Sequence, residues 1–310
     1  MEVSEMEKNN MFHFMYFVLS LLLCPLLPGI INKVKAFFAG RKGPSVFQLY
    51  YDLAKLVRKE GIQSTSSGGL VVLSPWVSLA ALLTAAVFLP LGGWISPFAF
   101  AGDMVLFFYL MGTARASQIL GAMDVGSSFE GMGASREAHF SALAETAVFA
   151  ILGFLVLLSG FASTSGILFN VFADSISATG ILLVVLAFFI VVITENCRVP
   201  ADDPDTHLEL TMIHEVMVLD HAGVDLAAVF YGGALKLWLF SSFLVLILLP
   251  AACIGTWSGS LLALAGTLLV SVLIGIVESS MARYRFLKVP QMITGALCIS
   301  LLAVFFLVFF

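Results

Sequence analysis

Charged residues are scarce in this 310-residue chain: Asp, Glu, Lys and Arg make up only 11% of it, against about 25% in an average soluble domain. Hydrophobic residues account for 60%. The apolar residues cluster in runs of about 17–25 residues, the length that crosses a bilayer. The composition excludes a water-soluble globule and predicts a polytopic integral membrane protein.

Basic residues are also in deficit, because 15 Lys and Arg stand against 20 Asp and Glu and leave a formal net charge of −5. This balance argues against a nucleic-acid-binding surface, which needs a concentrated excess of basic residues. The chain therefore has no predicted nucleic-acid partner.

Cysteine and nucleotide motifs are missing as well. The four cysteines (Cys24, Cys197, Cys253 and Cys298) are widely scattered and form no pair with the spacing of a zinc or iron–sulfur site. The sequence has no Walker loop, G-x-S-x-G elbow or dinucleotide fingerprint. No catalytic residue, metal or cofactor is therefore assigned to this chain, and any redox centre must belong to a partner.

Eight apolar runs predict transmembrane helices. Each is long enough to cross about 30 Å of hydrocarbon at about 1.5 Å per residue. Together they make residues 1–310 a single all-α membrane domain. The runs lie near 11–31, 71–95, 104–123, 141–162, 177–194, 229–252, 261–277 and 290–310.

Basic residues gather on one set of connections, and these are expected to face the cytoplasm. The seventh connection carries Arg283, Arg285 and Lys288. We therefore expect a multi-pass protein of the inner (cytoplasmic) membrane with both termini outside. The first connection, 32–70, holds Lys33, Lys35, Arg41, Lys42, Lys55, Arg58 and Lys59.

An amphipathic helix is predicted near 45–59 within this first connection. Its polar positions include Gln48, Asp52 and Lys55, and Pro44 suits a first helical turn. Such a helix either lies in the interface against anionic lipid or only anchors the surface. The apolar stripe consists of Val46, Leu49, Tyr50, Leu53, Leu56 and Val57.

Ionisable residues interrupt several of the predicted spans. Glu145 lies inside the fourth, Arg115 inside the third and Lys236 inside the sixth, and Glu278 ends the seventh. A charge at that depth is expensive unless it is paired, neutralised or facing water. Arg115 either neutralises Glu145 or takes part in an ion route, and the second interpretation is favoured.

The connection after the fifth span is rich in acid. Crowded carboxylates there suit a hydrated cavity or a basic partner and have coupled titrations suited to passing protons. His214-Glu215 is followed by His221, which is not the H-E-x-x-H spacing of a zinc site, so a proton relay or ordinary hydrogen bonding is favoured over metal. The acids are Glu195, Asp202, Asp203, Asp205, Glu209, Glu215, Asp220 and Asp225, against the single Arg198.

Four motifs between the spans resemble a known family. They read RKGPSVFQLYYDLAKLVRKE (41–60), GASREAHFSALAE (133–145), ENCRVPADD (195–203) and MARYRF (281–286). In this order they resemble the subunit-1 (subunit-H) family of respiratory complex I and its membrane-bound NiFe-hydrogenase relatives. The sequence is more similar to the hydrogenase branch, typified by the formate hydrogenlyase membrane subunit.

The resemblance implies a non-catalytic membrane subunit that couples electron transfer in a peripheral NiFe and Fe–S arm to proton or sodium movement. Its implied partners are hydrogenase-like large and small subunits, an Fe–S subunit and antiporter-like membrane subunits, which carry the NiFe centre and Fe–S clusters. Glu145 and Glu195 match the channel glutamates of the family, and Arg136 and Arg198 their nearby arginines. Asp202, Asp205, Glu209 and Asp220 match acidic loop positions, and Arg115, Lys236 and Glu278 join this ion-coupling set. The first and last motifs place arm docking at Arg41, Gln48, Asp52, Lys55, Arg283 and Arg285.

Two alternatives remain open. The first is a quinone-site subunit of an NADH:quinone oxidoreductase, although that branch carries Gln at the place of Phe140 and Ser-Tyr at the place of Leu143-Ala144. Ala201 and His207 also depart from the family pattern. The second is a stand-alone secondary transporter, for which paired internal repeats with broken helices are expected and none is evident.

Overall fold

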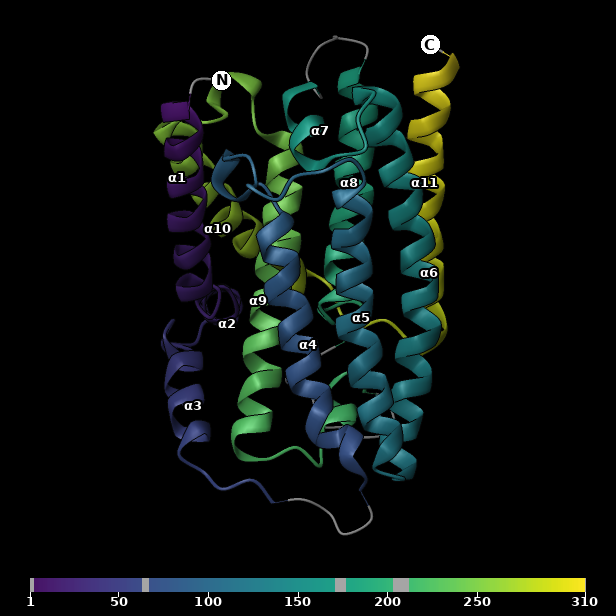
Figure 1. Cartoon of the computed structure of the whole chain (residues 1–310). Coiled ribbons are helices and arrows are strands. Elements are labelled where there is room, and N and C mark those ends of the chain that lie inside the picture. Colours follow the sequence, from purple (N-terminus) through teal and green to yellow (C-terminus); the bar gives the residue numbers. More distant parts are fainter. Residues whose placement is uncertain (1–2, 63–66, 171–176, 203–211, 310) are drawn as a thin grey trace.

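The computed structural model describes residues 3–62, 67–170, 177–202 and 212–309, and these form helices and connections with no β-strand. Figure 1 shows most of the long helices packed side by side, with the two chain ends at the same end of the molecule. The α-helices are α1 (Val3–Leu23), α2 (Leu26–Phe38), α3 (Gln48–Val57), α4 (Gly69–Phe88), α5 (Asp103–Asp124), α6 (Ser128–Ser159), α7 (Thr164–Asn170), α8 (Ser177–Glu195), α9 (Gly223–Leu248), α10 (Trp257–Ser280) and α11 (Val289–Phe309). Short 3-10 turns are η1 (Leu91–Gly93), η2 (Glu215–Val218), η3 (Ala251–Cys253) and η4 (Phe286–Lys288).

Six helical segments of the described chain are long and apolar enough to cross a membrane, and the bent pair α1–α2 makes seven. The prediction of a polytopic all-α protein is thus confirmed. The remaining expected span, the third, near 104–123, is the 22-residue helix α5, which lies outside that set and carries Arg115 and Gln118 in its second half. It packs along α4 (Figure 1).

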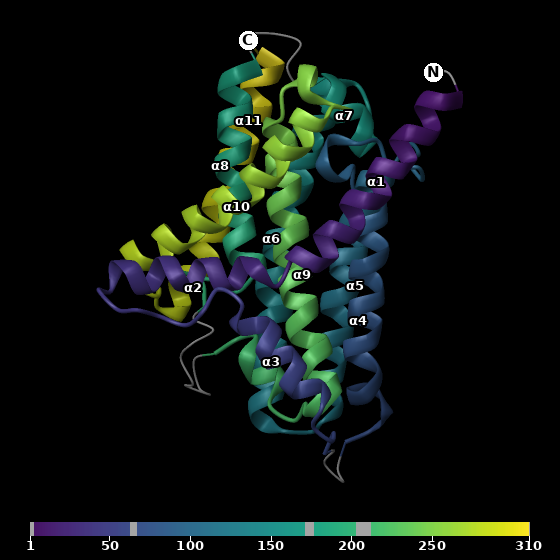
Figure 2. The ribbon, with the colours of Figure 1, turned by 90° about the vertical axis from the view of Figure 1, so that its left-hand side faces the viewer.

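The first predicted span, 11–31, is not one helix. Met6–Leu23 and Leu26–Phe38 meet at an angle of 47°. Pro25 has no N–H to give to the carbonyl of Leu21, which accepts instead from the hydroxyl of Tyr231 at 2.9 Å. The Tyr50 hydroxyl on α3 donates to the Leu22 carbonyl. Proline and two tyrosines therefore turn α2 away from α1, and α2 packs against α10 (Figure 2).

Helix α6 begins earlier than the sequence predicts. The expected fourth span starts at 141, but the helix runs without a break for 32 residues from Ser128. It contains no proline, and it ends at Gly160 in a left-handed conformation, φ 73°. Gly133 lets η2 approach, because an added Cβ would lie 2.3 Å from Val216. The segment predicted as a connection is thus part of a long helix.

The amphipathic helix is α3, and its apolar stripe faces protein. Leu49, Tyr50, Leu53 and Leu56 are half-buried, and the helix contacts α9 and α2. Val57, which we placed on the same stripe, is 59% exposed. This arrangement favours the anchoring role over a helix that lies free on lipid.

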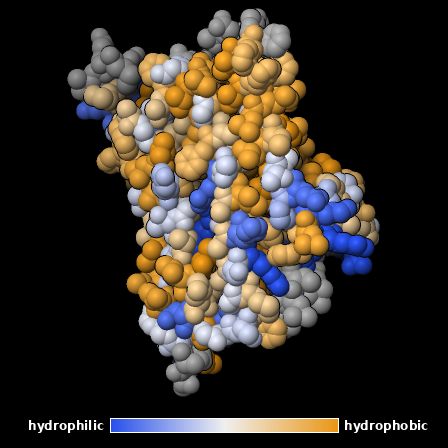
Figure 3. All heavy atoms as spheres, turned by 90° about the vertical axis from the view of Figure 1, so that its right-hand side faces the viewer, coloured by the Kyte–Doolittle hydropathy of each residue, from blue (hydrophilic) through white to orange (hydrophobic). Residues whose placement is uncertain are grey.

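Helix α9 forms the centre of the bundle. Every residue from Leu235 to Ile247 is buried except Lys236, which is half-buried. Trp238 and Phe240 pack there with Phe188 of α8 and Phe107 of α5. On the face shown in Figure 3 the upper half is almost entirely hydrophobic, and hydrophilic side chains gather halfway down and below. The fold thus places Lys236 within the buried central helix α9.

Candidate functional site

Arg115 joins two carboxylates from different helices. On α5, its guanidinium donates through Nη1 to Glu195 at the end of α8 and through Nη2 to Glu145 on α6. Arg115 and Glu195 are buried, whereas half of the Glu145 side chain is exposed. A planar guanidinium has donors in a fixed fork, which suits it to bridge two acids. Of the two interpretations of Arg115, pairing with Glu145 is observed, and the pair extends to Glu195.

Lys236 completes this cluster from the opposite side. Its ammonium lies 3.1 Å from Oε2 of Glu195 and also donates to the Glu195 main-chain carbonyl. The two Glu195 oxygens therefore face different cations, Oε1 facing Arg115 and Oε2 facing Lys236. We call Arg115, Glu145, Glu195 and Lys236 the four-charge cluster.

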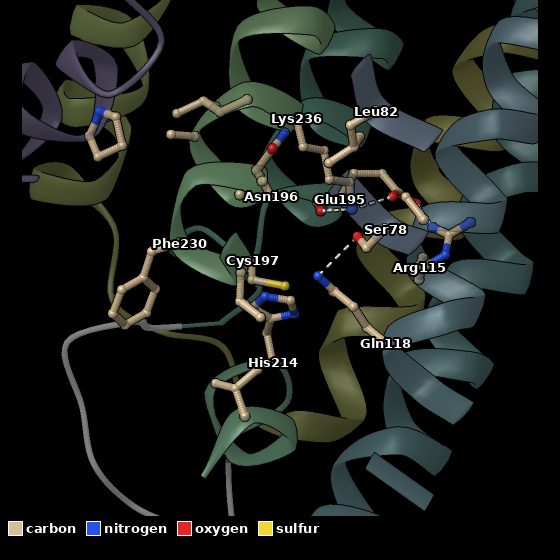
Figure 4. A pocket seen from close by; sticks show the side chains of 18 of the residues that line it. Ser78, Leu82, Arg115, Gln118, Glu195, Asn196, Cys197, His214, Phe230 and Lys236 are labelled. Carbon is tan, nitrogen blue, oxygen red and sulfur yellow. Dashed lines mark hydrogen bonds and ion pairs between the residues drawn. The ribbon is translucent and has the colours of Figure 1, made fainter. Parts of the chain in front are cut away.

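A cavity of about 180 Å³ opens beside the four-charge cluster. Figure 4 shows Arg115 and Gln118 on one side and Cys197 and His214 on another, with Glu195 and Lys236 above them. Gln118 is held by a 3.2 Å hydrogen bond to Ser78. The cavity reaches Pro28 of α2 and Leu49 of α3, so the bent first span and the amphipathic helix also form its wall.

Asp202 holds the acidic connection against this cavity. Its Oδ1 lies 2.6 Å from the Arg283 guanidinium, and its Oδ2 accepts from the main-chain N–H groups of Ile213 at 3.0 Å and His214 at 3.3 Å. Burial and the positive charge of Lys236 lower the pKa of His214 to about 4. Its imidazole is therefore neutral at pH 7.

Cys197, on the same wall, stands in a left-handed conformation at φ 50°. Burial raises the pKa of its thiol well above the usual value. The thiol is therefore neutral, which does not suit a nucleophile or a metal ligand.

Glu278 forms a second ionic group at the end of α10. Its side chain is fully buried and lies 3.2 Å from Lys35 of α2 and 3.8 Å from Arg198. Arg198 therefore lies beside Glu278 at the end of α10. Lys35 was not among the predicted site residues. The bend between α1 and α2 directs α2 toward α10 and brings Lys35 to Glu278.

The structure separates other predicted residues from the four-charge cluster. Arg136 donates to the Met212 carbonyl at 2.9 Å and stacks over the Phe286 ring at 5.1 Å, rather than pairing with Glu145. Asp220 gives its main-chain N–H to Glu130. Asp205 and Glu209 lie outside the described residues, as does His207.

The predicted docking residues divide into two groups. Arg41, Lys55 and Arg285 are exposed, and Gln48 donates to the side chain of Asp52 within α3 at 3.0 Å. Arg283 instead pairs with Asp202. In the described part of the chain no group of three or more His, Cys, Asp or Glu side chains has the arrangement to hold a metal ion.

Glu137 is a buried acid to which the sequence analysis gave no role. Glu137 on α6 is only 8% exposed and lines a small cavity that also touches Glu195 and Asp202. It belongs to a buried stripe of α6 that includes Glu130, Ala134, Phe140 and Ala144, spaced as on one helix face. This periodicity would have revealed Glu137 had the segment been interpreted as helix.

Fold and site together define a multi-pass helical membrane protein with a largely buried ionic cluster beside a cavity. A family model described as NADH dehydrogenase matches residues 11–309. The chain therefore belongs to the NADH dehydrogenase family, the subunit-1 (subunit-H) family of complex I that its motifs predict.

Two curated relatives agree with the hydrogenase branch of the resemblance. The chain is 32% identical to hydrogenase-4 component C of Escherichia coli strain K12 over 280 residues, covering 88% of this chain and 87% of that protein. It is 28% identical to formate hydrogenlyase subunit 4 of the same organism over 276 residues, covering 87% and 89%.

A solved structure shares the fold. A chain of the membrane-bound sulfane sulfur reductase, an archaeal respiratory membrane complex, superposes with a TM-score of 0.81 and covers 98% of this chain and 100% of its own length. At 20% sequence identity this likeness shows the fold alone.

Proposed function

We propose that this chain is the membrane anchor and coupling subunit of a complex I-like energy-converting complex of the formate hydrogenlyase or hydrogenase-4 type. In this role it links electron transfer in a peripheral arm to proton or sodium translocation. The observation that carries the proposal is the bridge by which Arg115 joins Glu145 on α6 to Glu195 on α8. The names of the two curated relatives support the type of complex.

The geometry of the four-charge cluster suits a switchable ion path. Glu195 lines both the 180 Å³ cavity and a smaller cavity of about 40 Å³ that contains Glu145. In this arrangement each carboxylate is compensated by a cation. An uncompensated buried charge costs several kcal/mol. A proton or cation that arrives at Glu195 therefore alters the balance that holds Arg115 between the two acids.

The half-exposed Glu145 provides the way out of the subunit. Its side chain is 50% exposed on the surface of α6, beside Tyr109 and Phe149. A carboxylate facing lipid would be expensive, so we infer that a neighbouring membrane subunit covers it. Antiporter-like subunits are the partners proposed for that surface.

Hydrogenase-like large and small subunits and an Fe–S subunit are the proposed peripheral arm. They would carry the NiFe centre and the Fe–S clusters. The exposed basic residues Arg41, Lys55 and Arg285 are the proposed docking contacts on this chain. The expected location is the inner membrane, with both termini on the outer side.

Purification of the intact complex through a tag on this chain tests the type of complex. Its subunits are identified by mass spectrometry, and nickel, iron and hydrogen evolution are measured on the same sample. Nickel with hydrogen evolution is the expected result. Iron without nickel, together with quinone-dependent and inhibitor-sensitive activity, would contradict the proposal and favour a quinone-site subunit.

A further inference from the structure

We propose that Glu137 is a further proton-carrying residue of the ion-coupling site and delivers its proton to Glu195. This inference rests on the proposed function and adds to it a carboxylate that none of the sequence motifs assigned. The observation is a small cavity that contains Glu137 and Glu195 together.

The position of Glu137 differs from that of every other carboxylate at the site. Glu145, Glu195, Asp202 and Glu278 each lie within 4 Å of an Arg or Lys side chain. The carboxylate of Glu137 has no hydrogen bond or ion pair to any other residue of the described chain, although the residue is only 8% exposed. Arg115 and Lys236 act on its charge from a greater distance.

The charges of the four-charge cluster balance without Glu137. Arg115 and Lys236 supply two positive charges, and Glu145 and Glu195, both in direct contact with them, supply two negative ones. The Asp202 carboxylate is paired separately with Arg283. A third negative charge at Glu137 would be buried without a partner, which is costly. The resting state that this balance favours has Glu137 as the neutral acid.

The small cavity provides the connection. It has a volume of about 20 Å³, and about 10–15 Å³ is the room that one water needs. Its wall includes Glu137, Ser141, Thr194, Glu195 and Asp202, so a water there has several polar partners. Glu195, Cys197 and Asp202 also line the 180 Å³ cavity, which makes the two spaces neighbours.

The proton step is balanced. The proton of the Glu137 carboxyl passes to the water, and the water passes one of its own protons to a Glu195 oxygen. Glu137 is left as a carboxylate, Glu195 becomes neutral and the water is restored. The charge of Glu137 then balances Arg115 and Lys236 from a greater distance in place of the charge of Glu195. Glu195 then no longer compensates Arg115 and Lys236, and the electrostatic balance of the four-charge cluster changes.

Infrared difference spectroscopy on the intact complex tests the inference directly. A protonated buried carboxyl has a C=O stretching band apart from those of carboxylates. We expect Glu137→Gln to remove such a band and Glu137→Asp to shift it, whereas Glu7→Gln, at an exposed position of α1, leaves it unchanged. If neither Glu137 variant alters any C=O band of a protonated carboxyl, the proposal is overturned.

Ion translocation by the same variants separates this inference from the proposed function. We expect Glu137→Gln to lose most of its ion translocation while electron transfer in the arm continues. If Glu195→Gln abolishes translocation and Glu137→Gln does not, the inference on Glu137 fails alone. If neither variant affects translocation, the proposed function fails with it. Should Glu137→Gln not assemble, the band shift and translocation of Glu137→Asp decide.

Discussion

The ammonium of Lys236 lies 3.1 Å from the carboxylate of Glu195, in the only half-buried position between Leu235 and Ile247 of the central helix. A lysine in such a position would be avoided in a helix whose single task is packing. Glu195 is in turn held by Arg115 from its other oxygen. The central helix is thus tied to the ionic site by one side chain.

Replacing Lys236 by Met is expected to destabilise the protein and reduce ion translocation. Methionine fills similar space but leaves a buried oxygen of Glu195 without its cation, and breaking such a pair costs about 3 kcal/mol. Thermal unfolding of the purified complex measures the loss. Lys59→Met, at an exposed position just after α3, serves as the matched control for stability. Equal unfolding temperatures for the two variants would show that the Lys236–Glu195 pair contributes nothing to stability.

Replacing Arg115 by Lys is expected to reduce ion translocation almost as severely as replacing it by Gln. Lysine keeps the charge but has no fork, so it cannot hold Glu145 and Glu195 at once. Translocation per electron is measured in proteoliposomes. Normal coupling in Arg115→Lys would show that charge alone matters and that the bridge does not.

Asp202 and Arg283 are expected to act as one unit on the acidic connection. Asp202→Asn and Arg283→Gln should each speed hydrogen exchange of the main chain over 212–222, because Asp202 also accepts from Ile213 and His214. In a double-mutant cycle the interaction energy should be about 0.5–3 kcal/mol. Strictly additive effects of the two substitutions would contradict the contact.

His214 is expected to make this connection sensitive to acid. Its pKa is about 4 in the folded protein against 6.5 for the ordinary side chain, so the unfolded or open state binds more protons between these values. Stability is therefore complete above pH 6.5 and falls as the pH drops toward 4. The protection factors of the amides over 212–222, obtained from hydrogen exchange at pH 7 and pH 5, measure the change. His214→Gln should lose this part of the pH dependence, and a variant with unaltered pH dependence would refute the assignment.

Two glycines of α6 form a matched pair. A Cβ at Gly133 would lie 2.3 Å from Val216 and 2.9 Å from the Ile213 carbonyl, whereas one at Gly131 meets nothing within 4 Å. Gly133→Ala is expected to destabilise the protein by about 1–3 kcal/mol. Gly131→Ala should be neutral or stabilise it by up to about 1 kcal/mol. Thermal unfolding compares them, and equal effects would contradict the close packing of η2 on α6.

The apolar runs predicted the helices well, because a span that cannot be solvated by water must be helical. They did not predict the bend after Leu23, since the hydroxyl donors that replace the lost N–H groups come from Tyr50 and Tyr231, which are distant in the sequence. They also placed the start of α6 too late. A membrane span and a helix are different things, and α6 continues beyond the apolar run.

All four residues of the four-charge cluster were named from the sequence, but which of them pair with one another was not predicted. Glu145, Arg115 and Lys236 stood out because charges are rare in apolar runs, and Glu195 because it heads the acidic connection and matches a family motif. Which cation faces which acid depends on how α5, α6, α8 and α9 pack, and no local pattern contains that. The sequence therefore did not reveal that Arg136 contacts Met212 and Phe286 or that Arg198 faces Glu278, and Glu137 was overlooked because its helical stripe was taken for a connection.

The central claim is that the bridge through Arg115 couples electron transfer to ion movement. The most direct measurement is the number of ions moved per electron by the reconstituted complex carrying Glu195→Gln, with Glu7→Gln as the exposed control. Glu195→Gln is expected to keep electron transfer in the peripheral arm but to move few or no ions, while Glu7→Gln behaves as the unmodified protein. An unchanged ratio of ions to electrons in Glu195→Gln would contradict it.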